Sequence, residues 1–354
     1  MKPGVSLLFS MLVGGSILAL VLALVGIPDI LATLSSMDLK FLVAMFLIAL
    51  LGRFLIAYRW SCILEAMGHH VPLLNLLWYY FTGFTFGYVL PSAQMGGEPV
   101  RAALLKRHDV PIATALSSVV IDASLGFTTT LVLGSAGLVI MLLTVSLSLK
   151  LRALLLLVAA LLAALLVVYY SRILSGKPVF APLFRFLGFG RRIYLLRKIA
   201  QMEEKVITFF HDKRNALAEV MLLSAVGMAA LFMEMWLALA VIGHQATMLE
   251  IVAVLTGLSL AYLVPIPGSM GVQEAAQATA AAAMKVASSV GVALSIVLRI
   301  RDVAWVLIGA LFLALHGPRT ARRLISEYAQ DQRVLGAEME QHLGGARVSP
   351  PHKE

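Results

Sequence analysis

Long, nearly unbroken apolar segments alternate with short polar stretches along most of this chain. The apolar segments cover residues 5–27, 41–67, 73–90, 111–149, 153–170, 216–243, 248–264 and 286–316. A helix of about 20 apolar residues crosses the roughly 30 Å of hydrocarbon in a bilayer. Because lipid offers no hydrogen-bond partners, each segment must satisfy its own backbone, which a helix does. The pattern predicts an all-α, polytopic integral membrane protein.

Composition agrees with a membrane location. Of the 354 residues, 60% are hydrophobic and 13% are charged, whereas a soluble domain carries about 25% charged residues. The net charge of +9 is what basic cytoplasmic loops produce, so we expect no nucleic-acid partner. The single cysteine, Cys62, excludes an intrachain disulfide and a thiolate metal cluster. The run at 5–27 is longer than the apolar core of a signal peptide and is interpreted as a retained first span.

Two Pro/Gly-rich stretches suggest an internal duplication. They run from Pro91 to Pro99 and from Pro265 to Glu274, and each follows a shorter apolar segment. A Gly-His pair precedes each of those segments, at Gly68-His69 and at Gly243-His244. Several features that recur in one order indicate a repeated unit.

Topology follows if 73–108 and 248–285 are re-entrant helical hairpins. Each half then has three full spans, about six in all, and the odd number inverts the second half, as in many transporters. The basic loop 171–215 and both termini are then cytoplasmic by the positive-inside rule. The predicted domains are a first membrane repeat (1–149), a second, inverted repeat (150–318) and a cytoplasmic tail (319–354).

Two points of this topology stay open. The segment 73–90 is itself long enough to be a full span, so the sequence leaves the re-entrant and the spanning arrangement both possible. In the tail, we expect a short interfacial helix at 319–335 and disorder beyond it.

Ionisable residues inside the spans are candidates for function, because each costs several kcal/mol unless it faces a cavity or an opposite charge. They are Arg53, Arg59, Glu98, Arg101, Asp122, Glu234, Glu274, Arg299, Arg301 and Asp302. For Arg53, Arg59 and Glu234 we favour ion pairs that hold helices together. Arg59 and Glu234 occupy equivalent places in the two halves, which suits a pair between them.

The two hairpins carry the most specific chemistry. Gly96 and Gly97 allow positive φ and expose backbone N–H groups, and Glu98 as N-cap with Pro99 at the first helical position would start a helix. A helix N-terminus favours an anion, and Arg101 can bind a phosphate or carboxylate through two hydrogen bonds. The arginines suit an anionic head group and the glutamates a cationic or zwitterionic one. The predicted substrate-binding residues are Gly96, Gly97, Glu98, Arg101, Asp122, Pro267, Gly268, Gly271, Glu274, Arg299, Arg301 and Asp302.

Enzyme signatures are missing from the sequence. It has no G-x-x-x-x-G-K-[ST], H-E-x-x-H, G-x-S-x-G or C-x-x-C motif. We therefore expect no cofactor, no metal site and no catalytic residue.

The stretches Pro91–Arg101 and Pro265–Glu274 resemble those of the lysylphosphatidylglycerol synthase transmembrane-region (flippase-like) family of bacterial membrane proteins. The resemblance covers about residues 5–318. The second stretch departs from the family at Ser269 or Met270, where a Gly is common, and at Gln273, where an Arg is common. Near Asp122 the family often has Asp-Arg, where this chain has Asp122-Ala123.

The resemblance implies transbilayer movement of a polar or anionic lipid, such as a phospholipid, across the bacterial inner membrane. Some members join this region to a soluble aminoacyl-transferase domain. The tail after residue 318 is too short for one, so we do not expect lysyl transfer.

Three alternatives stay open at this point. One is a membrane-embedded transferase that acts on a lipid-linked substrate, with Glu98 or Asp122 as the base. Another is a non-catalytic partner of lipid-biosynthesis enzymes. The third is a carrier of small solutes.

Overall fold

The structure, a computed structural model, describes residues 27–35, 37–90, 95–144, 149–182 and 193–345. Within these ranges the elements are helices and short 3-10 turns, without a strand, which confirms the predicted all-α class for the described residues. The structure separates into two compact units, Met1–Gly309 and Ala310–Glu354. Every residue predicted to bind substrate lies in the first unit.

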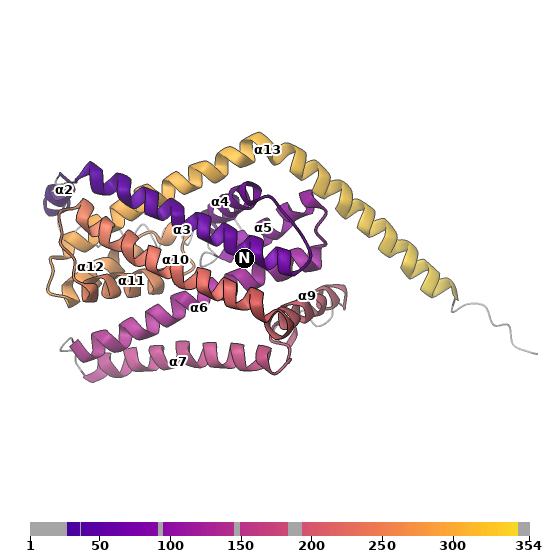
Figure 1. Cartoon of the computed structure of the whole chain (residues 1–354), viewed down its shortest axis with the longest axis horizontal. Helices are drawn as coiled ribbons and strands as arrows, with labels where there is room; N and C mark the ends of the chain where they lie inside the picture. The colour runs from indigo at the N-terminus through magenta and orange to yellow at the C-terminus, as the bar shows by residue number, and fades with distance from the viewer. Residues whose placement is uncertain (1–26, 36, 91–94, 145–148, 183–192, 346–354) are drawn as a thin grey trace, which may run out of the picture. The chain divides into compact units, whose positions relative to one another are not determined.

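Two runs of helices follow one another with the same order of α-helices, and the first run has one additional 3-10 turn, η2 (Figure 1). The first run consists of α3 (Leu39–Ala66), α4 (Leu73–Val89), η1 (Met95–Gly97), α5 (Glu98–Leu105), η2 (Lys106–His108) and α6 (Ile112–Thr144). The second run consists of α10 (Arg214–Val241), α11 (Met248–Tyr262), η4 (Pro267–Ser269), α12 (Val272–Ala283) and α13 (Ser288–Gly345). The short helix α2 (Ile27–Ser35) precedes the first run, and α7 (Leu149–Leu174) and α9 (Ile193–Asp212) lie between the two. The inverted orientation of the two runs stays a prediction.

Four helices in the described part of the chain are long and apolar enough to cross a membrane. They are Leu39–Ala66, Ile112–Val139, Leu155–Leu174 and Arg214–Val241, and each coincides with a predicted span. The predicted span at 5–27 lies outside the described residues. The predicted span at 286–316 coincides with the start of α13. The protein is therefore a helical membrane protein, while the total of about six spans and the re-entrant hairpins stay predictions.

Local chemistry explains where the long helices start and end. The Asp38 carboxylate accepts a hydrogen bond from the Lys40 N–H (2.8 Å) at the start of α3, as N-cap residues do. At the ends of α3 and α10 the chain turns at Gly68 (φ 84°) and Gly243 (φ 74°). Positive φ costs a glycine little, which explains why a glycine occupies both turns.

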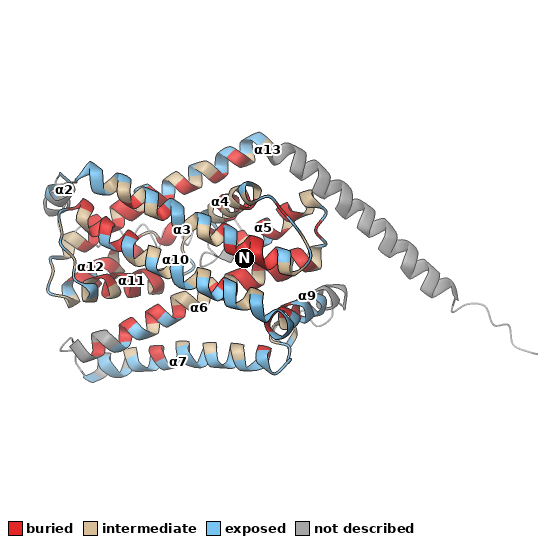
Figure 2. Cartoon of the chain, viewed as in Figure 1, coloured by how far each residue is buried: buried red, intermediate tan, exposed pale blue. Residues whose placement is uncertain are grey.

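The middle of the first unit is the most deeply buried part. In Figure 1, α3 and α10 run side by side, and these two helices pack against each other closely. An apolar core joins them to α11 and α13 through buried residues such as Met45, Met235, Leu255 and Val297. Figure 2 shows α11 and α12 largely buried, whereas most of α7 is exposed. Exposed leucines such as Leu157 and Leu161 on α7 are typical of a surface that faces lipid.

The structure adds two helical segments to the sequence analysis. The basic loop 171–215 contains α9, whose Glu203 is buried and accepts hydrogen bonds from the backbone N–H groups of Val179, Phe180 and Ala181. In the second unit, α13 continues to Gly345, whereas we expected the tail helix to end near residue 335. The residues from 319 to 345 include many Ala, Leu, Glu, Gln and Arg, which favour a helix even where the composition is polar.

Candidate functional site

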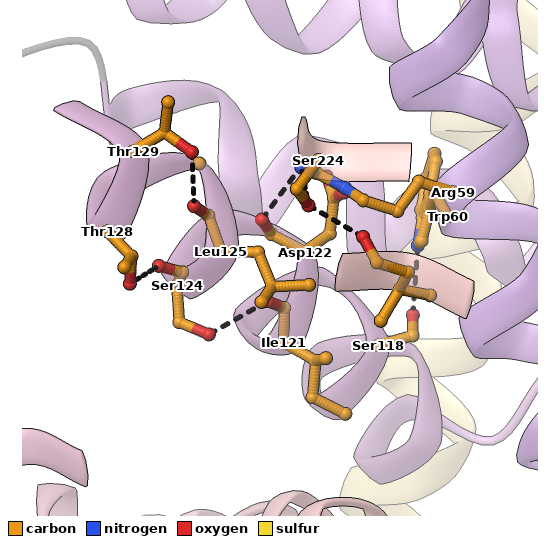
Figure 3. Close-up of polar contacts among 12 residues, drawn as sticks. Arg59, Trp60, Ser118, Ile121, Asp122, Ser124, Leu125, Thr128, Thr129 and Ser224 are labelled. Carbon is orange, nitrogen blue, oxygen red and sulfur yellow. Dashed lines mark hydrogen bonds and ion pairs between the residues drawn. The ribbon is translucent and has the colours of Figure 1, made fainter. Parts of the chain in front are cut away.

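A buried carboxylate, Asp122 on α6, joins three helices in the first run, and Figure 3 shows its contact with Arg59. Its Oδ1 accepts from Nε of Arg59 on α3 (2.9 Å), and its Oδ2 accepts from Nη2 of Arg101 on α5 (2.6 Å). Arg59 also donates to the Ser224 hydroxyl on α10 (2.9 Å). Charge-assisted hydrogen bonds in a buried place are the strong ones, so Asp122 holds both arginines in position.

Arg101 lies in a fixed position against aromatic rings. Its guanidinium carbon is 4.2 Å from the ring centroid of Trp60 and 5.6 Å from that of Tyr80, within the range of cation–π attraction. Its Nη1 donates to Glu98 Oε2 (3.1 Å). The Trp60 ring is itself held by a hydrogen bond from its Nε1 to the Ser118 hydroxyl (3.1 Å; Figure 3).

Glycines let α4 approach α5 closely at the same place. A Cβ added to Gly83 would lie 2.6 Å from Cγ of Arg101, and a Cβ added to Gly97 would overlap the Gly83 carbonyl. Gly97 caps α5 and Glu98 is the first helical residue. The prediction that Glu98 caps the helix is therefore wrong by one position, because its carboxylate binds Arg101 instead of a backbone N–H.

A second ion pair docks α12 on α13 in the second run. Arg299 donates from Nε to Glu274 Oε1 (3.0 Å), from Nη1 to the Tyr88 hydroxyl (3.1 Å) and to the Gly268 carbonyl (3.3 Å). The other oxygen of Glu274 accepts from the Gly271 N–H (2.8 Å). Through the Tyr88 hydroxyl, Arg299 of α13 also joins this ion pair to α4 of the first run.

Glycines break the backbone in this hairpin, as predicted. Gly268 has φ 57° inside η4, and Gly271 has φ 77° where α12 begins. Pro267 starts η4, and its ring restricts the φ angle at this position.

A third cluster is centred on Arg301, which is 2% exposed. Arg301 binds Glu234 of α10 through Nη1 and binds its neighbour Asp302 through Nε (3.0 Å) and Nη2 (2.7 Å). The suggested pair between Arg59 and Glu234 is wrong, because each of them binds the long helix that ends its own run. Arg59 pairs with Asp122 in the first run, and Glu234 pairs with Arg301 in the second.

A cavity of about 290 Å³ lies between the two runs. Helices α3, α4, α5, α6, α10, α11 and α13 all contribute to its wall. Three arginines and one glutamate supply its charge, and hydroxyl and apolar groups supply the rest. Its lining residues are Arg53, Tyr80, Gly83, Phe84, Gly97, Glu98, Arg101, Thr129, Thr130, Leu133, Leu231, Leu255, Leu258, Ser259, Tyr262 and Arg301.

The predicted site residues divide between this cavity and its supporting structure. Gly97, Glu98, Arg101 and Arg301 line the cavity. Asp122, Gly271, Glu274, Arg299 and Asp302 form the ion pairs and hydrogen bonds described above, without being among the cavity's lining residues, and Gly96, Pro267 and Gly268 lie in the 3-10 turns η1 and η4.

Arg53 is the cavity residue that the sequence analysis assigned to a structural pair. Its Nε is buried and has no hydrogen-bond partner, and no ion pair in the described part of the chain includes it. A buried polar group without a partner is costly. A ligand oxygen in the cavity would satisfy it.

His108, at the end of η2, lies outside the membrane-spanning helices. Its Nε2 lies 3.2 Å from Nδ2 of Asn75 and 3.2 Å from the Tyr79 hydroxyl. Burial, together with the neighbouring Arg107 charge, lowers the pKa of His108 below its ordinary value. An amide NH₂ can only donate, so the nitrogen that faces it accepts, and the neutral imidazole fits this place.

The described residues contain no cluster of three or more His, Cys, Asp and Glu side chains suited to a metal ion. The chain has no match among curated proteins. A family model described as the lysylphosphatidylglycerol synthase transmembrane region matches residues 7–310. This match covers most of the chain and includes the cavity and all three charge clusters, and we conclude that the protein belongs to the lysylphosphatidylglycerol synthase transmembrane-region family.

Proposed function

We propose that the protein moves a polar, preferably anionic lipid across the bacterial inner membrane. The family links the chain to lipid metabolism, and the cavity supplies a place for the head group. In this proposal 73–108 and 248–285 are re-entrant hairpins in inverted repeats, 1–149 and 150–318. The tail 319–354 and both termini are cytoplasmic, and lipid-biosynthesis enzymes are candidate partners.

The observation that carries the proposal is the charge of the cavity wall. Arg53, Arg101 and Arg301 line it together with a single acidic residue, Glu98. Three carboxylates that pair with Arg101 or Arg301 are not among the lining residues; they are Asp122, Glu234 and Asp302. A phosphate or carboxylate in the cavity would therefore meet guanidinium groups first, and planar guanidinium groups bind such oxygens well.

Contributions from both runs favour transport over simple binding. Arg53, Glu98 and Arg101 come from the first run, and Tyr262 and Arg301 come from the second. If the runs move relative to each other, the site opens on one side and closes on the other. Broken helices that meet at a shared site between repeats are typical of alternating-access transporters.

The test is lipid movement by the full chain in proteoliposomes that contain fluorescent, head-group-intact phosphatidylglycerol. We expect Arg53→Gln to slow movement at least about tenfold, since a hydrogen bond to a charged group contributes about 1.5–3 kcal/mol and each 1.4 kcal/mol is about tenfold. Arg152→Gln, on the exposed start of α7, removes one positive charge away from the cavity and is the matched control.

Two results would contradict the proposal. One is wild-type protein, folded and correctly inserted, that moves no lipid faster than empty liposomes. The other is chemical turnover of a lipid-linked donor by the purified protein without movement, which would favour the transferase.

A further inference from the structure

A second cavity lies beside the first, and α5, α6 and α7 contribute to its wall. It has a volume of about 370 Å³ and lies between α6 and α7. Its wall is almost wholly apolar and includes Phe127 and Leu131 of α6 and Leu165 and Leu166 of α7. We call it the α6–α7 groove.

Glu98 lines both the central cavity and the α6–α7 groove. Its partner Arg101 lines the central cavity, and its neighbour Pro99 lines the groove. The start of α5 therefore separates a charged compartment from an apolar one, so a single amphiphilic molecule could reach both past Glu98.

The groove also borders the surface that faces lipid. Leu165 lines the groove and is 51% exposed, and most of α7 is exposed in Figure 2. Thr128 of α6 also lines the groove. Its hydroxyl lies 2.7 Å from the Tyr170 hydroxyl of α7, and this hydrogen bond holds the two helices together. A chain could therefore enter sideways from the bilayer without separating α6 from α7.

We propose that the α6–α7 groove holds a hydrocarbon chain of the same lipid whose head group occupies the central cavity. The inference rests on the proposed function and specifies its substrate as a molecule with a long apolar chain, not a water-soluble anion. A chain that stayed in the charged cavity would lose favourable apolar contact for each of its methylenes. The groove provides that contact and lets only the head group leave the hydrocarbon.

The test uses phosphatidylglycerol with a photoreactive diazirine at the end of one acyl chain, added to the full chain in nanodiscs. After irradiation, mass spectrometry locates the labelled peptides. We expect label on the α6 and α7 peptides that contain Phe127 and Leu165. Ala123→Phe fills the groove and should reduce that label at least fivefold, and it should slow lipid movement in parallel. Ala136→Phe, the same change at an exposed position of α6, should leave both unchanged.

A second pair of variants guards against misfolding. Leu165→Trp narrows the groove from α7, whereas Leu161→Trp adds the same side chain at a neighbouring position that is 61% exposed. If one lipid occupies both compartments, Arg53→Gln should also lower groove labelling, although Arg53 lines only the central cavity.

The outcomes separate the inference from the proposed function. Label spread evenly over the exposed face of α7, or groove label that is unchanged in Ala123→Phe and Arg53→Gln, would overturn the inference even where lipid movement persists. Groove label that depends on Ala123 and on Arg53, in a protein that moves no lipid, would support the inference and overturn transport instead.

Discussion

In the first run, the hairpin helix α5 supplies the arginine, Arg101, and the long helix α6 supplies the carboxylate, Asp122. In the second run the charges are exchanged, because α12 supplies Glu274 and α13 supplies Arg299. The preceding long helices are exchanged too, with Arg59 on α3 and Glu234 on α10. Two hairpins, each with a 3-10 turn between two α-helices, are thus docked by ion pairs of opposite polarity.

The difference between the runs shows which part of the pairing serves the fold. Docking a short helix needs an opposite charge on the long helix, whichever partner carries the positive sign. The cavity is sensitive to that sign, because Arg101 lines it and Glu274 does not. Asp122 also pairs with two arginines, Arg59 and Arg101. In the second run two arginines pair with separate glutamates, Arg299 with Glu274 and Arg301 with Glu234.

The largest effect should come from Asp122→Asn, which keeps the shape and removes the shared negative charge. Arg59 and Arg101 would lose their common partner in a buried place, which costs about 3–5 kcal/mol for broken buried pairs. Unfolding in detergent, followed by circular dichroism, measures the change. Asp212→Asn, at an exposed end of α9, is the control, and equal stability of the two variants would refute the central role of Asp122.

Charge exchange should distinguish the two regions next. The double variant Glu274→Arg with Arg299→Glu should recover part of the stability that either single change removes. It restores the ion pair but loses the hydrogen bonds to the Gly271 N–H and the Gly268 carbonyl, about 1 kcal/mol each. The double variant Arg101→Asp with Asp122→Arg should not recover, because the new arginine would face Arg59. Thermal unfolding of seven proteins measures this: the wild type, the two double variants and the four matching single variants Glu274→Arg, Arg299→Glu, Arg101→Asp and Asp122→Arg. Recovery in both regions would mean that the regions do not differ as described.

The glycine contacts provide a smaller test. Gly97→Ala places a methyl group against the Gly83 carbonyl, a backbone atom that cannot turn away, and overpacking costs about 1–3 kcal/mol. In the second hairpin, a Cβ at Gly257 would lie 3.1 Å from the Ala276 carbonyl oxygen, so Gly257→Ala should cost less. Melting temperatures of both variants decide the order, and a larger loss for Gly257→Ala would show that the first hairpin is not the tighter one.

The smallest expected effect is a pH dependence from His108. Its folded-state pKa lies below the unfolded value, so the unfolded chain takes up a proton first as pH falls. The contribution of neutral His108 to the free energy of unfolding should be fully present above the unfolded pKa of about 6.5. It should decline as pH falls from there toward the folded-state pKa. The measurement is the melting temperature at about one pH unit above and about one unit below the unfolded pKa of about 6.5. His108→Gln should reduce the difference between these two melting temperatures. An unchanged difference would assign the pH dependence to other groups.

Apolar patterning was sufficient to predict the long apolar helices but not their charge partners. The long apolar runs placed α3, α6, α7 and α10 within a few residues, because helix formation in lipid depends on local composition. Pairing between Arg59 and Asp122 joins residues far apart in the chain, and no local pattern encodes it. The matching places of Arg59 and Glu234 pointed to a pair between them, whereas each residue forms its ion pair inside its own run.

The site was predicted in part for the same reason. Gly97, Glu98 and Arg101 lie in one short motif that is visible in the sequence. Arg53 lies in an ordinary apolar run, and nothing nearby distinguishes it from Arg59. Only the packed helices show that one arginine is saturated by Asp122 and that the other has a free Nε in a cavity.

The connection between the two runs also constrains any movement. Glu203 of α9 binds the chain just after α7, and the Met202 carbonyl accepts a hydrogen bond from the Ser117 hydroxyl of α6 (3.0 Å). These hydrogen bonds attach α9 to α6 of the first run and to the chain after α7. Only Lys213, with φ −103° and ψ 50°, separates α9 from α10. In a rocking motion between the runs, Lys213 would be the hinge. Spin labels on α9 and α10 would then change their separation, whereas labels on α9 and α6 would keep theirs.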